Sequence, residues 1–258
     1  MNERPELRTT GAGSAVVGNE RTTALASAVL LPLIVGALLT AARTRVLLSA
    51  HIVVGVVLVG PLAVKIGSTG YRFVRYYRGS APFVAKGPPL PVLRVLAPLL
   101  LAATLALIAS GIALDVTGPD HGGPLIPLHN VTAMIWLPMI AIHVFAHLRS
   151  VPSRIVDDWR RQAAEPASGR GRRLTLILGA LVGGTIATTL TVPLNTAWID
   201  WTKTNAAGPP APLLAGTLAT TLVLLPRRVR AALVSGPDTD RGDTQDRSSS
   251  PGPPETPP

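Results

Sequence analysis

The chain has 258 residues, of which 47% are hydrophobic and 15% are charged, and its formal net charge is +10. A soluble domain carries about a quarter charged residues, so the deficit favours a protein whose exterior faces lipid. The complete lack of cysteine excludes a disulfide framework, a thiolate zinc site and an iron–sulfur cluster. The arginines lie between apolar stretches rather than along one soluble face, so the positive charge does not indicate nucleic-acid binding.

Apolar segments of the length that crosses a bilayer, about 20 residues, organise the chain. Residues 1–22 come first and are polar, which predicts a disordered cytoplasmic tail rather than a cleaved signal peptide. Five spans follow, at residues 23–42, 46–66, 94–114, 127–148 and 174–195. A shorter sixth, 207–226, begins with prolines, which the first turn of a helix tolerates. Residues 235–258 are rich in Pro, Ser and Asp and predict a second disordered tail.

The basic residues predict the orientation of these spans. Twenty of the 24 Lys and Arg residues fall on one side of a six-span model, in the N-terminal tail, in 67–94, in the basic loop 149–173 and after 226. Positive residues mark the cytoplasmic side, so both termini are expected inside the cell membrane. The stretch RFVRYYRG continues the second span as a basic, aromatic helix end, which we expect at the inner leaflet, where anionic lipid attracts it.

The glycines of the fifth span, Gly179, Gly183 and Gly184, form a small-residue pattern. Helix contact within one bundle explains this pattern about as well as dimerisation does, so an oligomer remains an open expectation. On the outer side, Trp198 and Trp201 follow the fifth span. Their loop is expected to cover the outer end of the bundle or to dock a partner.

Four of the five histidines fall within predicted spans, where polar residues are candidates for function. His51 lies near the outer start of the second span and His129 near the outer start of the fourth, so the two share one membrane level. His143 follows His129 by fourteen positions, which places both within about 40° of one helix face and about 21 Å apart along the axis. This spacing shows only that such ligands could face one another across the bundle.

This histidine pattern resembles the bacterial membrane b-type cytochromes, broadly the cytochrome b561 type, which includes cytochrome subunits of hydrogenases and formate dehydrogenases. The segments AHIVVGVVLVGPLAVKIGSTGYRFVRYYRG and LHNVTAMIWLPMIAIHVFAHL are also similar to an actinobacterial group of small membrane proteins in this class. The resemblance covers 23–148 and implies a four-helix bundle that binds haem b. We expect 174–226 to pack alongside this bundle. The resemblance also implies His51 and His129 as axial ligands of an outer haem, and electron transfer between a quinone and a partner redox protein.

The sequence departs from the two-haem pattern at Lys65, which stands where a second ligand opposite His143 is expected. A neutral lysine amine can ligate iron, and the side chain could instead hold a haem propionate or a quinone oxygen. The simpler alternative is that Lys65 extends its ammonium group to the inner interface. His147, one turn beyond His143, is an interfacial histidine or an alternative inner ligand. One haem is therefore expected, and a second depends on His143, Lys65 and His147.

Other functions fit the sequence less well. The predicted spans contain no Asp or Glu and the chain has no HExxH motif, which disfavours zinc catalysis and proton-coupled transport. The remaining alternative is a non-haem polytopic scaffold or small transporter, in which His51 and His129 only join helices. His121 lies in an outer loop and is expected to be a solvated turn residue. At most, the chain is the electron-transfer subunit of an oxidoreductase.

Overall fold

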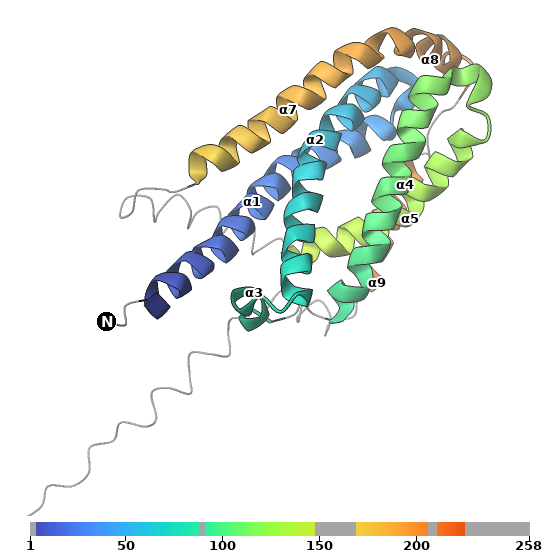
Figure 1. The fold of residues 1–258 in the computed structure, drawn as a ribbon. Helices are drawn as coiled ribbons and strands as arrows, with labels where there is room; N and C mark the ends of the chain where they lie inside the picture. The colour runs from blue at the N-terminus through green and yellow to red at the C-terminus, as the bar shows by residue number, and fades with distance from the viewer. Residues whose placement is uncertain (1–3, 88–90, 148–168, 206–210, 225–258) are drawn as a thin grey trace, which may run out of the picture.

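The computed structural model describes residues 4–87, 91–147, 169–205 and 211–224, which are helical apart from short turns. The elements are α1 (Arg4–Ala41), α2 (Thr44–Tyr77), α3 (Ala81–Ala85), α4 (Pro91–His121), α5 (Leu125–His147), α7 (Arg170–Thr191), the 3-10 turn η2 (Val192–Leu194), α8 (Asn195–Thr202) and α9 (Ala211–Leu224). Figure 1 shows the long helices running along one common direction. The predicted all-α class is confirmed for the described residues.

Five helical stretches are long and apolar enough to cross a membrane. They are Ala15–Ala41, Thr44–Tyr77, Leu93–His121, Leu125–His147 and Arg170–Thr202. These correspond to the first five predicted spans. The described part of the predicted sixth span is α9, a helix of 14 residues. At 1.5 Å per residue it is about 21 Å long, which falls short of a hydrocarbon core about 30 Å thick.

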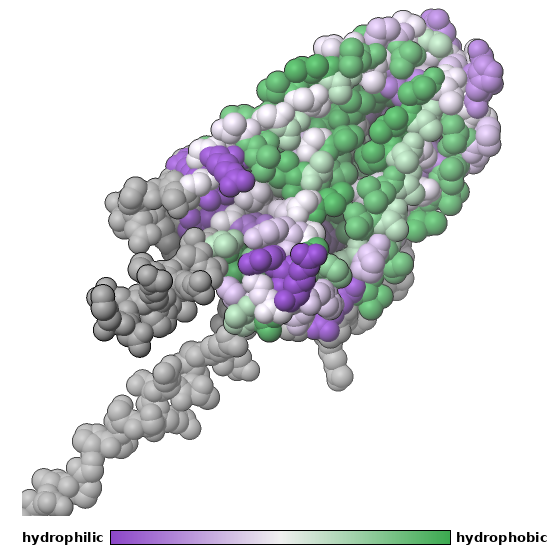
Figure 2. All heavy atoms as spheres, in the orientation of Figure 1, coloured by the Kyte–Doolittle hydropathy of each residue, from purple (hydrophilic) through white to green (hydrophobic). Residues whose placement is uncertain are grey.

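Large apolar side chains cover much of the outside of the molecule. Leu39, Val95, Val116, Leu190 and Val223 are each more than 60% exposed. Figure 2 shows hydrophobic side chains along the full length of the helices, with hydrophilic ones gathered toward the ends. A water-soluble protein does not expose apolar surface on this scale, whereas hydrocarbon solvates it. The chain is therefore a multi-pass membrane protein.

The first helix begins earlier than the sequence predicts, because residues 4–22, expected as a disordered tail, continue α1. Distant partners hold this segment against α2. Asn19 donates from Nδ2 to the carbonyl oxygen of Ser68 at 3.0 Å, and the Thr23 hydroxyl donates to the Ser68 hydroxyl at 2.9 Å. These partners lie 49 and 45 positions away, so local polarity alone suggested a tail that the folded chain does not have.

An ion-pair cluster supports the same region. The carboxylate of Glu20 pairs with Lys86, which follows α3, and lies 3.7 Å from the Arg72 guanidinium on α2. The Glu20 side chain is only 12% exposed. The cluster therefore joins α1, α2 and the residues after α3 at one end of the bundle. The other predicted polar segments, most of 149–173 and all of 235–258, lie outside the described residues.

The helices form two groups with a looser boundary between them. Helix α2 packs mainly against α1 and α7, while α5 packs against α4 and α9. Helices α2 and α4 contact each other much less, and α8 touches both at one end of the bundle. Figure 2 shows an apolar furrow along the boundary between the two groups. We call the end that carries α8 the α8 end of the bundle.

Two glycines set the crossing of α2 and α7. A Cβ added to Gly60 would stand 2.1 Å from the Ala180 carbonyl oxygen, and one added to Gly184 would stand 2.8 Å from the Val57 carbonyl oxygen. Both distances exclude any side chain, so the two backbones touch here. Gly179 and Gly183 have nothing within 4 Å of such a Cβ. Of the glycine pattern in this span, only Gly184 lies where an added Cβ would meet another described helix.

Helix α4 continues past the predicted end of the third span at residue 114 and reaches His121. Gly118, at φ 71°, bends its last turns, and Asp115 is only 6% exposed. The helix therefore carries a buried acidic residue one position past the predicted third span. Trp198 of α8 contacts this end of α4, because its indole donates to the Leu114 carbonyl oxygen at 3.1 Å.

Candidate functional site

His51 and His129 meet near the α8 end of the bundle, at the boundary between the two helix groups. His51 comes from α2 and His129 from α5, and their ring centroids are 6.4 Å apart with ring planes at 80°. The sequence predicted that these two histidines share one membrane level. Their position against each other confirms that geometric expectation, although it does not by itself identify a ligand.

A backbone carbonyl fixes the hydrogen-bonding role of His51. Its Nδ1 lies 3.0 Å from the carbonyl oxygen of Ala37 on α1, and the Thr40 hydroxyl oxygen lies 3.3 Å from the same nitrogen. A carbonyl oxygen only accepts, so Nδ1 carries the hydrogen and donates it. In a neutral imidazole the other nitrogen, Nε2, then has its lone pair available.

Ser110 fixes the role of His129 in the same way. The Ser110 hydroxyl donates its only hydrogen to the Leu107 carbonyl oxygen at 3.0 Å, and its oxygen lies 2.9 Å from Nδ1 of His129. With its hydrogen on Leu107, the hydroxyl accepts from His129, and this Nδ1 then also carries the hydrogen. Both histidines keep Nε2 available, each oriented by a second group on a neighbouring helix. Metal-ligating histidines commonly donate their second nitrogen in this manner.

The separation of the rings fits two axial ligands of one iron. With metal–nitrogen bonds of about 2 Å on either side, two axial imidazoles place their ring centroids about 6 Å apart. The observed value is 6.4 Å. Gly111 on α4 gives His129 its room, because an added Cβ would stand 3.2 Å from Cε1 of the imidazole. Gly55, one turn from His51 on α2, also borders open space.

A second group of polar side chains lies farther from the α8 end. Lys65 donates from Nζ to the Ser27 hydroxyl on α1, and the described chain offers it no carboxylate partner. His143 interacts electrostatically with Lys65 and with His147, whose ring centroid is 4.8 Å away. Lys65 and His143 are therefore within electrostatic reach of each other. The Lys65 ammonium group donates to Ser27 on the neighbouring helix.

Trp136 lies between these two levels on α5. It is 8% exposed, and its indole donates to the Thr104 hydroxyl on α4 at 2.9 Å. Trp136 therefore belongs to the packed contact between α4 and α5. Trp198 is likewise buried at 4% exposure, which makes it a packing residue of α8 rather than part of a docking surface. His121 is exposed, as predicted.

Sequence reasoning missed two buried polar groups near the α8 end. Asp115 on α4 and Asn195 on α8 are 6% and 4% exposed, and their Oδ1 atoms have no hydrogen-bond partner within the described residues. The signal for Asp115 was its place one residue past a predicted span. Nothing in the sequence separates Asn195 from other loop residues.

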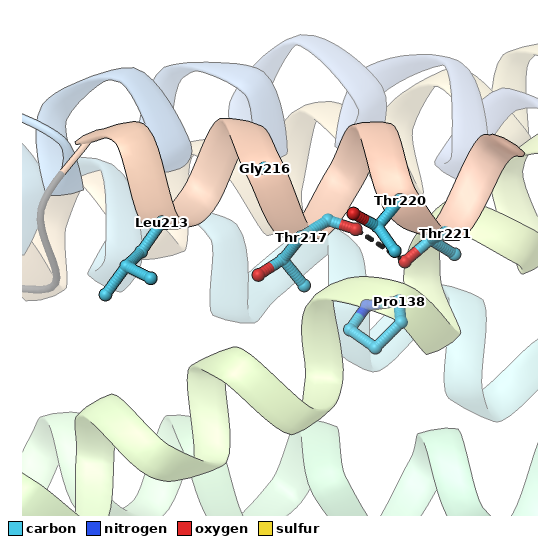
Figure 3. A pocket seen from close by; sticks show the side chains of 6 residues that line it. All are labelled: Pro138, Leu213, Gly216, Thr217, Thr220 and Thr221. Carbon is cyan, nitrogen blue, oxygen red and sulfur yellow. Dashed lines mark hydrogen bonds between the residues drawn. The ribbon is translucent and has the colours of Figure 1, made fainter. Parts of the chain in front are cut away.

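A shallow hollow of about 390 Å³ lies away from the histidines, between α5 and α9. Figure 3 shows its lining of Pro138, Leu213, Gly216, Thr217, Thr220 and Thr221. The Thr221 hydroxyl donates back to the Thr217 carbonyl oxygen at 2.7 Å. None of the predicted ligand residues borders this hollow, so it is separate from the histidine site.

The number of ligating side chains limits what the histidine site can hold. Among the described residues, no three His, Asp or Glu side chains gather where they could bind one metal ion. A haem iron needs only two ligands from protein, because its macrocycle supplies the others.

Comparison of the chain with protein-family models, curated proteins and solved structures finds no match. The resemblance to membrane b-type cytochromes thus rests on the residues alone.

Proposed function

We propose that this chain is a membrane-bound b-type cytochrome that passes electrons between a quinone and a partner oxidoreductase. The observation that carries the proposal is the neighbouring pair His51 and His129, with ring centroids 6.4 Å apart and both Nδ1 atoms already engaged. Haem b would supply reversible one-electron transfer. The two histidines would hold it between the helix groups, where Figure 2 shows an apolar furrow.

The neighbouring residues have defined roles in this proposal. The Ala37 carbonyl and the Ser110 hydroxyl each accept a hydrogen bond from a ligand ring, which fixes its orientation and raises the basicity of Nε2. Gly111 keeps the His129 ring free of a side-chain clash. The surrounding apolar helices exclude water and thereby tune the reduction potential.

The level of Lys65 and His143 is the proposed quinone contact. Reduction of one quinone to a quinol takes two electrons, delivered one at a time, and two protons. Lys65 has one ammonium hydrogen on Ser27 and two more to offer to a carbonyl oxygen. A second haem in this region would need His143 with Lys65 or His147. The hydrogen bond from Lys65 to Ser27 favours a single haem with a polar inner pocket.

We also propose the finer topology: six spans in the cell membrane, with both termini in the cytoplasm. The distribution of Lys and Arg supports this orientation. The chain has no cysteine, so single cysteines can be introduced and labelled from either side. We expect His121→Cys to react with a membrane-impermeant maleimide in whole cells and Ser80→Cys to react only after lysis. The reverse pattern would overturn the orientation.

The decisive test is a reduced-minus-oxidised visible spectrum of the purified protein. We expect a sharp b-type alpha band that disappears in His51→Ala and in His129→Ala, while the matched control His121→Ala keeps it. A protein expressed with ample haem that shows no Soret band would contradict the cytochrome proposal.

The competing function is a non-haem scaffold or small transporter, favoured by one specific observation. His51 and His129 each hydrogen-bond to a neighbouring helix, and rings at this separation can also contact each other directly. The variants His51→Asn and His129→Asn separate the two functions. Asparagine can keep a donor near the position of Nδ1 but offers nothing in place of Nε2. A scaffold tolerates this change, whereas a cytochrome loses its haem.

A further inference from the structure

The end of α2 that lies away from α8 carries an unusual combination of exposed rings and cations. Tyr71, Phe73 and Tyr77 are 47%, 61% and 68% exposed. Phe73 and Tyr77 lie against each other, with ring centroids 4.5 Å apart. Arginines alternate with these rings along the last two turns of the helix. Amphipathic rings beside cations are typical of the headgroup layer of a membrane.

The length of α2 places this end at a membrane surface. The helix has 34 residues, which corresponds to about 51 Å at 1.5 Å per residue. A bilayer with its headgroups is about 40–45 Å thick, so a moderately tilted helix of this length crosses both headgroup layers. Arg43 and Arg45 then lie at one surface and Arg75 and Arg78 at the other.

Arg75 is held in place without an acidic partner. Its guanidinium carbon lies 6.0 Å from the centroid of the Tyr71 ring and 5.8 Å from that of the Phe83 ring. Phe83 is buried beneath it, because α3 folds back after the turn at Gly79. The Ser80 amide donates to the Arg75 carbonyl oxygen at 3.0 Å and closes the helix end. The rings and the turn therefore restrict Arg75 before any ligand arrives.

Among the described residues at this end of α2, the cations outnumber the acidic groups. Glu20 is the acidic group of the cluster, and it is already paired with Lys86 and Arg72. Arg75 and Arg78 are exposed and have no acidic partner among the residues that the structure describes. A guanidinium group presents forked donors that match the two free oxygens of a phosphodiester.

We infer that this surface, Tyr71–Arg78 together with Phe83, binds the phosphodiester headgroup of an anionic phospholipid. Arg75 and Arg78 make the contact, and the exposed rings lie among the upper acyl chains and glycerol groups. This role is independent of the proposed haem. It assigns the cationic helix end to one lipid in the adjacent leaflet, rather than to a soluble polyanion, because the surface continues directly from a membrane-spanning helix.

The test is lipid selection by the full chain in nanodiscs. Equal amounts of phosphatidylglycerol and phosphatidylcholine with identical acyl chains are supplied, and native mass spectrometry counts the lipids that each variant retains. We expect the native chain to retain phosphatidylglycerol preferentially. The double variant Arg75→Gln with Arg78→Gln should lose roughly fivefold in this preference per arginine at low ionic strength.

The matched control is Arg43→Gln with Arg45→Gln, which removes the same charge from the opposite end of α2. We expect this control to keep the preference of the native chain. An unchanged preference after substitution of Arg75 and Arg78 would overturn the inference. So would an equal loss in the control, because it would make the preference a property of net charge rather than of this surface.

Discussion

Ser110 and His129 are joined by a contact whose direction is determined by a third group. The Ser110 oxygen lies 2.9 Å from Nδ1 of His129, and the hydroxyl gives its hydrogen to the Leu107 carbonyl oxygen. In this arrangement His129 donates to Ser110 and keeps the lone pair of Nε2 available. Ser110 on α4 thus favours the tautomer of His129 on α5 that carries its hydrogen on Nδ1. In this tautomer Nε2 has the free lone pair that ligation of a haem iron would require.

Removal of this hydroxyl should weaken the site without unfolding it. For Ser110→Ala we expect haem retention to fall about tenfold, as loss of a group that orients a metal ligand typically does. The measurement is the haem-to-protein ratio during dialysis against an apo-haem-binding protein. Thr104→Ala is the matched control, since its hydroxyl contacts Trp136 instead of a proposed ligand. Equal haem loss in both variants would assign Ser110 a general packing role.

The space beside His129 gives a second prediction. In Gly111→Ala the new methyl group would stand 3.2 Å from Cε1 of the imidazole, which forces the ring to shift by a few tenths of an ångström. We expect altered axial-ligand geometry, visible in the low-spin electron paramagnetic resonance signal of the oxidised protein. Gly179→Ala, where nothing lies within 4 Å, should leave the signal unchanged. An unaltered signal in Gly111→Ala would argue against His129 as an axial ligand of the iron.

The sequence predicted the number and place of the five long spans, but not where some of these helices begin and end. A helix that crosses the hydrocarbon core needs about 20 mainly apolar residues, and such runs are easy to recognise in a sequence. The five long spans were predictable for this reason. The early start of α1 was not predicted, because Asn19 and Thr23 are held by hydrogen bonds to Ser68, which is distant in the sequence. Likewise, α8 and the extended end of α4 are joined by a contact between Trp198 and Leu114 that no local pattern encodes.

The candidate site was predictable in part for a similar reason. Counting residues into each span placed His51 and His129 at one level, since helical rise is regular. Counting could not select Ser110 or Ala37 as their partners, because this depends on how each helix is rotated about its axis. Lys65 showed the same limit, since its hydrogen bond to Ser27 is set by the packing of α1 on α2.

The crossing of α2 and α7 predicts a sharp difference between adjacent glycines. An alanine at Gly184 places its Cβ 2.8 Å from the backbone of Val57 and must push the helices apart. We expect Gly184→Ala to lower the free energy of unfolding by about 2 kcal/mol, in the range typical of overpacking. Gly183→Ala is the control, because its Cβ meets nothing within 4 Å. The melting temperature in one detergent measures both variants, and equal values would contradict the close approach.

Lys65 allows the proposed quinone contact to be tested apart from the proposed haem. Lys65→Met keeps much of the side-chain length and removes all three ammonium hydrogens. Because Lys65 is not one of the neighbouring pair His51 and His129, we expect an unchanged alpha band. Oxidation of the reduced protein by a water-soluble quinone should slow about tenfold, the cost of roughly one charge-assisted hydrogen bond. Stopped-flow absorbance of the haem follows this reaction.

The control is Ser27→Ala, which frees the Lys65 ammonium group from its partner and should keep most of the rate. Full activity in Lys65→Met would place the quinone elsewhere, whereas loss of the alpha band would make Lys65 part of the haem site.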